Sequence, residues 1–246
     1  MTTPRWRDPI RCLAACAIAL FTCQPTASVE APQPTPPESV RFEHDMMVRF
    51  HMHENFDLLR AIEKLLVRGK LDEVRLLARG IAEAPDEPGM AAWAKQATLV
   101  RERAAALATA PDAGEACRRE ARLAVACAGC HVDAGASPEF RSPGQVPPDR
   151  PTIEARMTRH LWATDRLWEG IVGPSDEAWR QGLDVLAATP LSSVQDVDGG
   201  FARRLQRLAD RARVQQATAT ANDRAHSYGE ILMTCTGCHT AKPKAP

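Results

Sequence analysis

The feature that most constrains the fold is a helical spacing of apolar residues that proline and glycine interrupt at regular intervals. From residue 41 to 84, Leu, Ile and Val recur at helical spacing, and Gly69 divides this stretch into two expected helices. Two more helices are expected at 89–109 and 112–130, on either side of Pro111. The first half of the chain therefore predicts four helices.

The second half repeats this plan. Its expected helices run from Pro151 to Val172, 175 to 188, 197 to 215 and 221 to 238. Weak similarities at offsets of 104 or 105 residues, such as Met52 with Met157, indicate an internal duplication. The sequence offers no alternating apolar segments of the kind that build a sheet. It predicts an all-α fold of two tandem antiparallel four-helix bundles, each with a motif at its C-terminal end.

Proline-rich stretches set the expected boundaries of the two halves. The predicted division is a signal peptide at 1–28, a Pro-rich tether at 29–40, a first bundle at 41–131, a Pro-rich linker at 132–151, a second bundle at 152–239 and a tail at 240–246. Each bundle segment is long enough to bury a modest core of its own.

The N-terminal segment has the pattern of an export signal. Three arginines precede an uncharged run from residue 12 to 23, which is too short to span a bilayer as a mature helix. Two processing routes stay open: cleavage before Cys23, as in a bacterial lipoprotein, and ordinary cleavage near Ser28. The mature protein is thus expected to be periplasmic or otherwise exported, without a transmembrane helix and with a lipid anchor in the first case.

Composition excludes one class of partner and leaves the core short of aromatic residues. The 31 basic and 31 acidic side chains cancel, so the chain lacks the excess positive charge with which proteins bind nucleic acid. Aromatic residues make up only 5% of the sequence. A core of this composition would gain from a bound apolar group.

Each half ends in the same motif, Cys127-Ala128-Gly129-Cys130-His131 and Cys235-Thr236-Gly237-Cys238-His239, and equivalent positions of the two copies are 108 residues apart. C-x-x-C-H is the attachment sequence of c-type haem. Cysteines three positions apart lie on one face of a helical turn and can form thioethers to the two vinyl groups of one porphyrin, and the adjacent imidazole becomes an axial iron ligand. The predicted cofactors are two c-type haems. Their attachment residues are Cys127, Cys130, Cys235 and Cys238, and their iron ligands are His131 and His239.

Paired cysteines also have uses other than haem attachment. A C-x-x-C pair can be a redox dithiol or half of a zinc site, and two pairs can join in one four-cysteine zinc site or form disulfides. Haem is favoured because both copies carry the histidine, both close an expected helix, and the chain carries an export signal. The separate Cys117 is expected to be a buried, inert thiol.

A haem-attachment motif at the end of a fourth helix resembles the class II cytochromes c, the cytochrome c-prime-like four-helix bundles. The resemblance covers 41–131 and 152–239, although only the two motifs in it are specific. It implies that each haem lies within a bundle, with the motif histidine as fifth ligand and the first helix facing the other side of the ring.

In that family a methionine on the first helix gives a six-coordinate electron carrier, whereas an apolar residue leaves the iron open to small gases. The resemblance thus assigns Met52 and Met157 as candidate distal ligands, 75 and 78 residues before their cysteines. A helical methionine is also a common core filler, and a shifted alignment would use Met47 instead. Histidines of the first helices offer a second type of ligand, namely His44, His51, His53 and His160.

These expectations define an exported c-type cytochrome that moves single electrons between other redox proteins and is not an enzyme. Two alternatives keep the haem: a five-coordinate protein that binds NO or CO, and a dihaem peroxidase that would use acid–base residues near His51 and His53. A structural helical protein stapled by zinc is the alternative without haem.

Overall fold

The computed structural model describes residues 38–85, 88–136, 140, 144–191 and 197–241. The expected signal peptide, the cleavage sites and most of the tether lie outside the described residues. Within the described part of the chain all regular structure is helical, which confirms the all-α prediction. None of the helices in these ranges is both long and apolar enough to cross a membrane.

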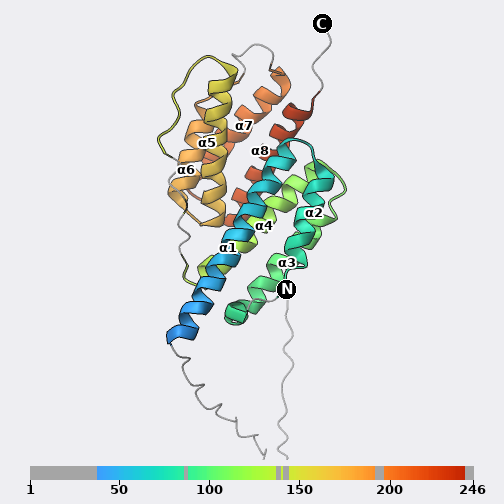
Figure 1. Ribbon diagram of the computed structural model, residues 1–246. Coiled ribbons are helices and arrows are strands. Elements are labelled where there is room, and N and C mark those ends of the chain that lie inside the picture. The colour runs from blue at the N-terminus through green and yellow to red at the C-terminus, as the bar shows by residue number, and fades with distance from the viewer. Residues whose placement is uncertain (1–37, 86–87, 137–139, 141–143, 192–196, 242–246) are drawn as a thin grey trace, which may run out of the picture. The chain divides into compact units, whose positions relative to one another are not determined.

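The helices lie close to the ranges expected from the sequence (Figure 1). In the first half they are α1 (Glu38–Val67), α2 (Leu71–Ala82), the 3-10 helix η1 (Pro88–Trp93), α3 (Ala94–Ala108) and α4 (Ala113–Asp133). In the second half they are α5 (Ile153–Val172), α6 (Asp176–Ala187), α7 (Gly199–Gln215) and α8 (Ala221–Thr240). Two details differ from the expected ranges. Helix α1 begins three residues before the expected bundle, and the helix expected at 89–109 starts as a 3-10 turn.

Short polar side chains explain where most of these helices begin. The residue before each of five helices accepts a hydrogen bond from a backbone N–H of the first turn, which would otherwise lack a partner. These caps are Asp112, Thr152, Ser175, Asp198 and Thr220. At the turn between α1 and α2, Gly69 adopts a φ of 68°, a left-handed conformation that ends a helix at little cost for glycine.

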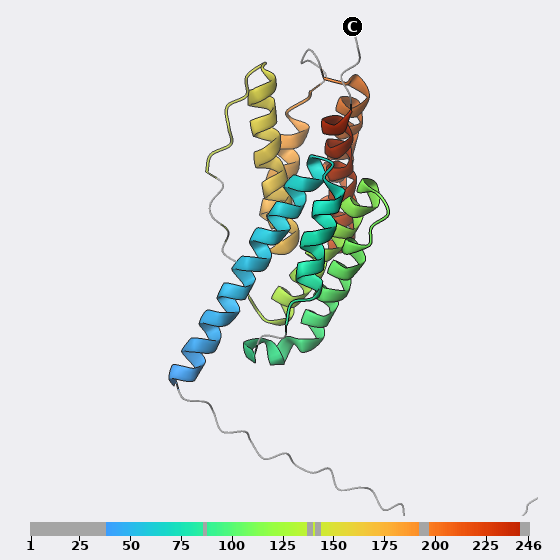
Figure 2. The same ribbon diagram turned by 45° about the vertical axis from the view of Figure 1, so that its right-hand side comes forward.

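Consecutive helices pack against each other within each half, and α4 and α8 join the halves (Figures 1 and 2). Smaller contacts link α1 to α8 and α4 to α5. One hydrophobic cluster draws side chains from both halves, so the interior is continuous across the chain.

Helices α4 and α8 cross at close range and run in opposite directions. A Cβ on Gly229 would lie 3.2 Å from the Cα of Arg118 and 3.6 Å from the Cβ of Ala121, so the missing side chain lets the two backbones approach. Toward the other end of α8, the Thr236 hydroxyl lies 3.6 Å from the Sγ of Cys117, which comes earlier on α4. Later positions on α8 therefore face earlier positions on α4.

The contacts between the halves follow an approximate two-fold relation. Arg60 of α1 forms an ion pair with Asp165 of α5, and these residues stand 105 positions apart, which is the offset of the predicted duplication. At a two-fold axis equivalent positions face each other, so in a symmetric dimer Arg60 would meet a second arginine. In this chain opposite charges, those of Arg60 and Asp165, meet there instead.

Two buried hydrogen bonds repeat this relation. Tyr228 on α8 donates to Oε1 of Glu63 on α1 at 2.7 Å, and the indole of Trp168 on α5 donates to Oε1 of Glu120 on α4 at 3.2 Å. Glu63 and Trp168 are 105 positions apart, and Glu120 and Tyr228 are 108 apart, the spacing of the two motifs. The same pair of positions is thus used twice, with the carboxylate in the first half and the aromatic donor in the second.

Candidate cofactor-attachment sites

The two C-x-x-C-H motifs occupy the last turns of α4 and α8. Because these helices are antiparallel, the motifs lie at opposite ends of the pair. Cys127 comes seven residues after Glu120, and Cys235 comes seven residues after Tyr228 on the oppositely directed helix. At 1.5 Å per residue, the two attachment points are about 21 Å apart along the helix pair.

Each motif ends against the turn that follows the first helix of the other half. Nδ1 of His131 lies 2.8 Å from the backbone oxygen of Val172, at the end of α5. Thr240, next to His239, packs against Gly69 in the turn between α1 and α2. These two contacts of the motifs thus follow the same approximate two-fold relation as the contacts between the halves described above.

The contact made by His131 orients its ring. A carbonyl oxygen can only accept, so Nδ1 carries the hydrogen, and in the neutral form of the ring the lone pair that can bind a metal is on Nε2. Histidines that bind metals commonly donate from their other nitrogen to a backbone carbonyl in this way, which orients the ring. His131 is half-buried in this arrangement, whereas His239 is exposed.

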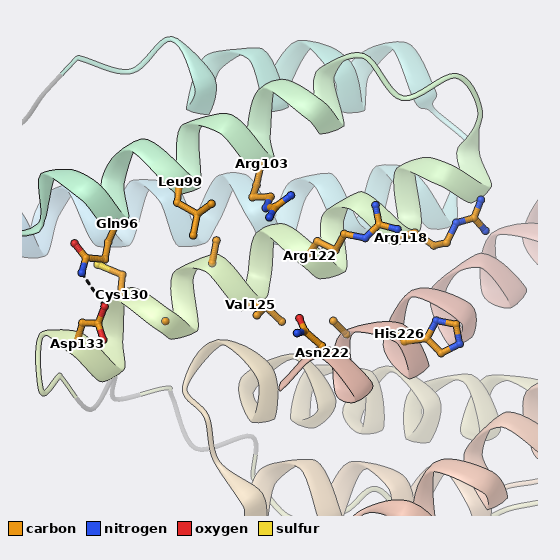
Figure 3. Close-up of a pocket in the computed structure, with 13 residues that line it drawn as sticks. Gln96, Leu99, Arg103, Arg118, Arg122, Val125, Cys130, Asp133, Asn222 and His226 are labelled. Atoms are coloured by element: carbon orange, nitrogen blue, oxygen red, sulfur yellow. Dashed lines mark hydrogen bonds between the residues drawn. The ribbon is translucent and has the colours of Figure 1, made fainter. Parts of the chain in front are cut away.

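The first motif borders a cavity of about 510 Å³ between α3, α4 and the beginning of α8 (Figure 3). Cys130 lies at one end of it, next to Gln96, whose amide donates to Asp133 at 2.7 Å. Nothing approaches within 4 Å of a Cβ placed on Gly129. Cys127 instead packs against the hydrophobic cluster. This motif therefore has one cysteine toward open space and one toward the core.

The second motif is more closely covered. Cys235 packs against the hydrophobic cluster, and Cys238 is half-buried. A Cβ on Gly237 would lie 2.5 Å from the ring of Phe201 on α7, so this ring covers the middle of the motif. The two sites thus share their residue pattern but differ in how much of the helix face is open.

The cysteines of both motifs are free thiols with suppressed ionisation. Burial raises the pKa of Cys127 to about 12 and that of Cys235 to about 12, and it also raises the pKa of Cys130 and Cys238. A redox dithiol needs an accessible thiolate, so these environments disfavour that use.

The arrangement also bears on the zinc alternatives. The two C-x-x-C pairs lie at opposite ends of α4 and α8, so they do not combine into a four-cysteine site. Within the described ranges no three His, Cys, Asp or Glu side chains converge as metal ligands. Two unpaired thiols one helical turn apart, followed by an imidazole with a free nitrogen, fit the attachment of a c-type haem.

The candidate distal methionines lie level with the motif histidines. Met52 precedes Glu63 by eleven residues on α1, and His131 follows Glu120 by eleven residues on α4. Glu63 and Glu120 are near enough to interact electrostatically, and three reversals of direction make α1 and α4 antiparallel. Met52 and His131 therefore both lie about 16 Å from the level of Glu63 and Glu120, measured along the helices and in the same direction.

The second half has the same spacings. Met157 precedes Trp168 by eleven residues on α5, and His239 follows Tyr228 by eleven residues on α8. Met52 and Met157 are both half-buried, and Met157 packs against the hydrophobic cluster. The offset of 105 between α1 and α5 pairs Met157 with Met52, whereas Met47 is exposed and out of register.

Two of the first-helix histidines, His51 and His160, have other partners. Nε2 of His51 accepts from the Asn55 amide at 2.9 Å, and Nε2 of the buried His160 donates to the backbone oxygen of Thr189 at 2.7 Å. Burial lowers the pKa of His160, which keeps it neutral. His53 is exposed, and the side chain of His44 lies outside the described residues. These contacts favour methionine over histidine as the distal candidate.

Sequence reasoning missed a set of buried polar residues midway between the motifs. Glu63, Glu120, Trp168 and Tyr228 meet there, with one residue each from α1, α4, α5 and α8. Cys117 is fully buried nearby, as predicted. The available signal was a charged residue within an apolar helix face, such as Glu63 beside Ile62. Helical spacing alone does not tell which partner such a residue meets.

No protein-family model, curated protein or solved structure matches this chain. Its function must therefore be argued from its own residues.

Proposed function

We propose that this protein is an exported dihaem c-type cytochrome that transfers single electrons between other redox proteins. The observation that carries the proposal is the contact between His131 and Val172, because it leaves Nε2 of a motif histidine free to bind iron. The repetition of the motif at the equivalent end of α8 extends the proposal to a second haem.

In this proposal each half is one haem-binding four-helix bundle. Thioethers from Cys127 and Cys130 would hold the first haem, and thioethers from Cys235 and Cys238 would hold the second. His131 and His239 would be the proximal iron ligands. Bound haem supplies an iron that alternates between the ferric and ferrous states, so the chain needs no nucleophile or general base.

The residues of this chain would set the potential and the accessibility of each iron. Met52 and Met157, level with the histidines, would supply thioether ligands that favour the ferrous state and raise the potential. Packing of Cys127 and Cys235 against the hydrophobic cluster would keep water from one side of each site. Attachment at opposite ends of α4 and α8 would let one end accept an electron while the other donates.

Absorption and low-temperature electron paramagnetic resonance spectra test this proposal. The protein is produced with the haem-attachment machinery and measured in its oxidised and reduced forms. Two covalent haems in low-spin states are expected, with a sulfur-to-iron charge-transfer band. Met52→Ala and Met157→Ala should each remove part of that band, whereas the control Met47→Ala, at an exposed position of the same helix, should leave it intact.

Each contrary outcome identifies a different alternative. High-spin ferric iron that binds CO after reduction would favour the gas-binding or peroxidase function. An intact charge-transfer band in both methionine variants would refute the assigned ligands. A colourless protein would exclude the cytochrome.

A further inference from the structure

The core polar cluster, defined here as Glu63, Glu120, Trp168 and Tyr228, lies where α1, α4, α5 and α8 meet. Its two carboxyl groups are almost completely buried, with exposed fractions of 5% for Glu63 and 0% for Glu120. Burying two carboxylates is costly unless each is neutralised by a partner or by a proton. Each of the two buried acids must therefore have either a partner or a proton.

Glu63 is neutralised by its neighbours. It forms an ion pair with Arg60 and accepts a hydrogen bond from the Tyr228 hydroxyl. Arg60 also pairs with Asp165 and lies over the Trp168 ring, with its guanidinium carbon 5.4 Å from the ring centroid. Burial raises the pKa of Glu63, and the ion pair with Arg60 and the hydrogen bond from Tyr228 offset only part of this rise.

Glu120 lacks comparable support. Its Oε1 accepts from the Trp168 indole at 3.2 Å, while its buried Oε2 has no hydrogen-bond partner among the described residues. An ionised carboxylate would leave this oxygen unpaired beside the charge of Glu63. Burial and then the charge of Glu63 raise the pKa of Glu120 to about 8. A proton is therefore the remaining means of neutralising Glu120.

The position of Glu120 links it to the proposed haem sites. It precedes Cys127 by seven residues, so both lie on one face of α4 about 10 Å apart. The charge of Glu120 acts on the Cys127 thiol, and the charge of Glu63 acts on the Cys235 thiol. The cluster thus lies between the two attachment points and interacts with the interior cysteine of each.

We propose that Glu120 is a proton-binding site whose occupancy is coupled to the oxidation state of the protein. The proposal rests on the dihaem function above. When one electron enters from a donor protein and is held at a haem on α4, the Glu120 carboxylate takes one proton from solvent. When the electron leaves to an acceptor, Glu120 returns that proton. Each cycle moves one electron and up to one proton, and no other reactant is needed.

The titratable, charged and polar groups that face Glu120 come from four helices. They are Arg60 and Glu63 from α1, Trp168 from α5, Tyr228 from α8, and Cys117 and Cys127 from α4 itself. Burial raises the pKa of Tyr228 well above its ordinary value and that of Cys127 to about 12, so both stay neutral near pH 8.

The expected coupling is measurable. We take the separation of Glu120 and the attachment residue Cys127, about 10 Å, as the distance between the two charges. At an effective dielectric constant of about 20, unit charges this far apart change each other's equilibrium, here the binding of the proton and of the electron, roughly tenfold. For one electron this corresponds to about 59 mV. We therefore expect the midpoint potential of the first haem to fall by about this amount as the pH rises through the titration of Glu120.

Potentiometric titration of the full holoprotein at a series of pH values tests the coupling. Glu120→Gln mimics the protonated acid and should remove this fall in potential. The control Glu102→Gln, at an exposed position on α3, should behave as the wild type. If both haems are present and Glu120→Gln keeps the pH dependence of the wild type, the coupling is wrong and the dihaem function stands.

A second measurement needs no variant. Reduction of the wild-type holoprotein in weakly buffered solution near pH 8, followed with a pH indicator, should take up a fraction of a proton per electron. The absence of uptake would overturn the coupling even if Glu120→Gln fails to fold. A colourless protein would overturn both proposals together.

Discussion

Replacing Glu120 with glutamine should stabilise the folded protein relative to the wild type by an amount that grows with pH. Glutamine keeps an oxygen that accepts from the Trp168 indole and carries no charge, so it resembles the protonated acid. It also places an amide where Oε2 has no hydrogen-bond partner, which contributes a difference that does not depend on pH.

The sign follows from the two states of the wild type. In the unfolded chain the pKa of Glu120 is near 4.5, whereas burial and the charge of Glu63 raise it to about 8 in the folded protein. Between these values only the folded state holds the proton, so a rising pH lowers the free energy of unfolding. This dependence is absent below both pKa values, and the full loss is reached above the higher one.

The magnitude is the difference between the two pKa values, about 3.5 units, times about 1.36 kcal/mol per unit. The wild type should therefore lose up to about 5 kcal/mol relative to Glu120→Gln over this range. This figure is an upper bound, because water penetration and local relaxation reduce the cost of burying a charge.

Guanidinium denaturation followed by far-ultraviolet circular dichroism, between about pH 5 and pH 8.5, measures this difference. The control Glu102→Gln should run parallel to the wild type, since that side chain is exposed. If the stability difference between Glu120→Gln and the wild type is the same at every pH, Glu120 does not hold a proton in the folded state.

Two further substitutions test the packing between the halves by denaturation. Gly229→Ala would put a methyl group 3.2 Å from the Cα of Arg118 and is expected to lower the free energy of unfolding by about 1–3 kcal/mol. The control Gly80→Ala, with nothing within 4 Å of the added carbon, should be neutral or stabilising. Equal effects of the two substitutions would contradict a close crossing of α4 and α8. Tyr228→Phe removes the hydroxyl donor to buried Glu63 and should cost about 1–3 kcal/mol, and an unchanged stability would show that this bond is not formed.

The local sequence was sufficient to predict the helices and most of their limits. Prolines, Gly69 and capping residues such as Thr152 and Asp198 act within a few positions of where they stand, so their effect can be predicted without the rest of the chain. The same holds for the two motifs, because cysteines three positions apart share a helix face wherever that helix is placed.

The tertiary structure decided what each of these helix faces meets. That Glu63 accepts from Tyr228, 165 positions later, and that Glu120 receives a single donor, depends on how four helices from two halves pack. Helical periodicity shows that a side chain points inward but carries no information about its distant partner. The hydrogen bond from His131 to Val172 likewise depends on how α4 packs against the end of α5, and the opposite placement of the motifs follows from the antiparallel crossing of α4 and α8. Long-range packing alone determines both.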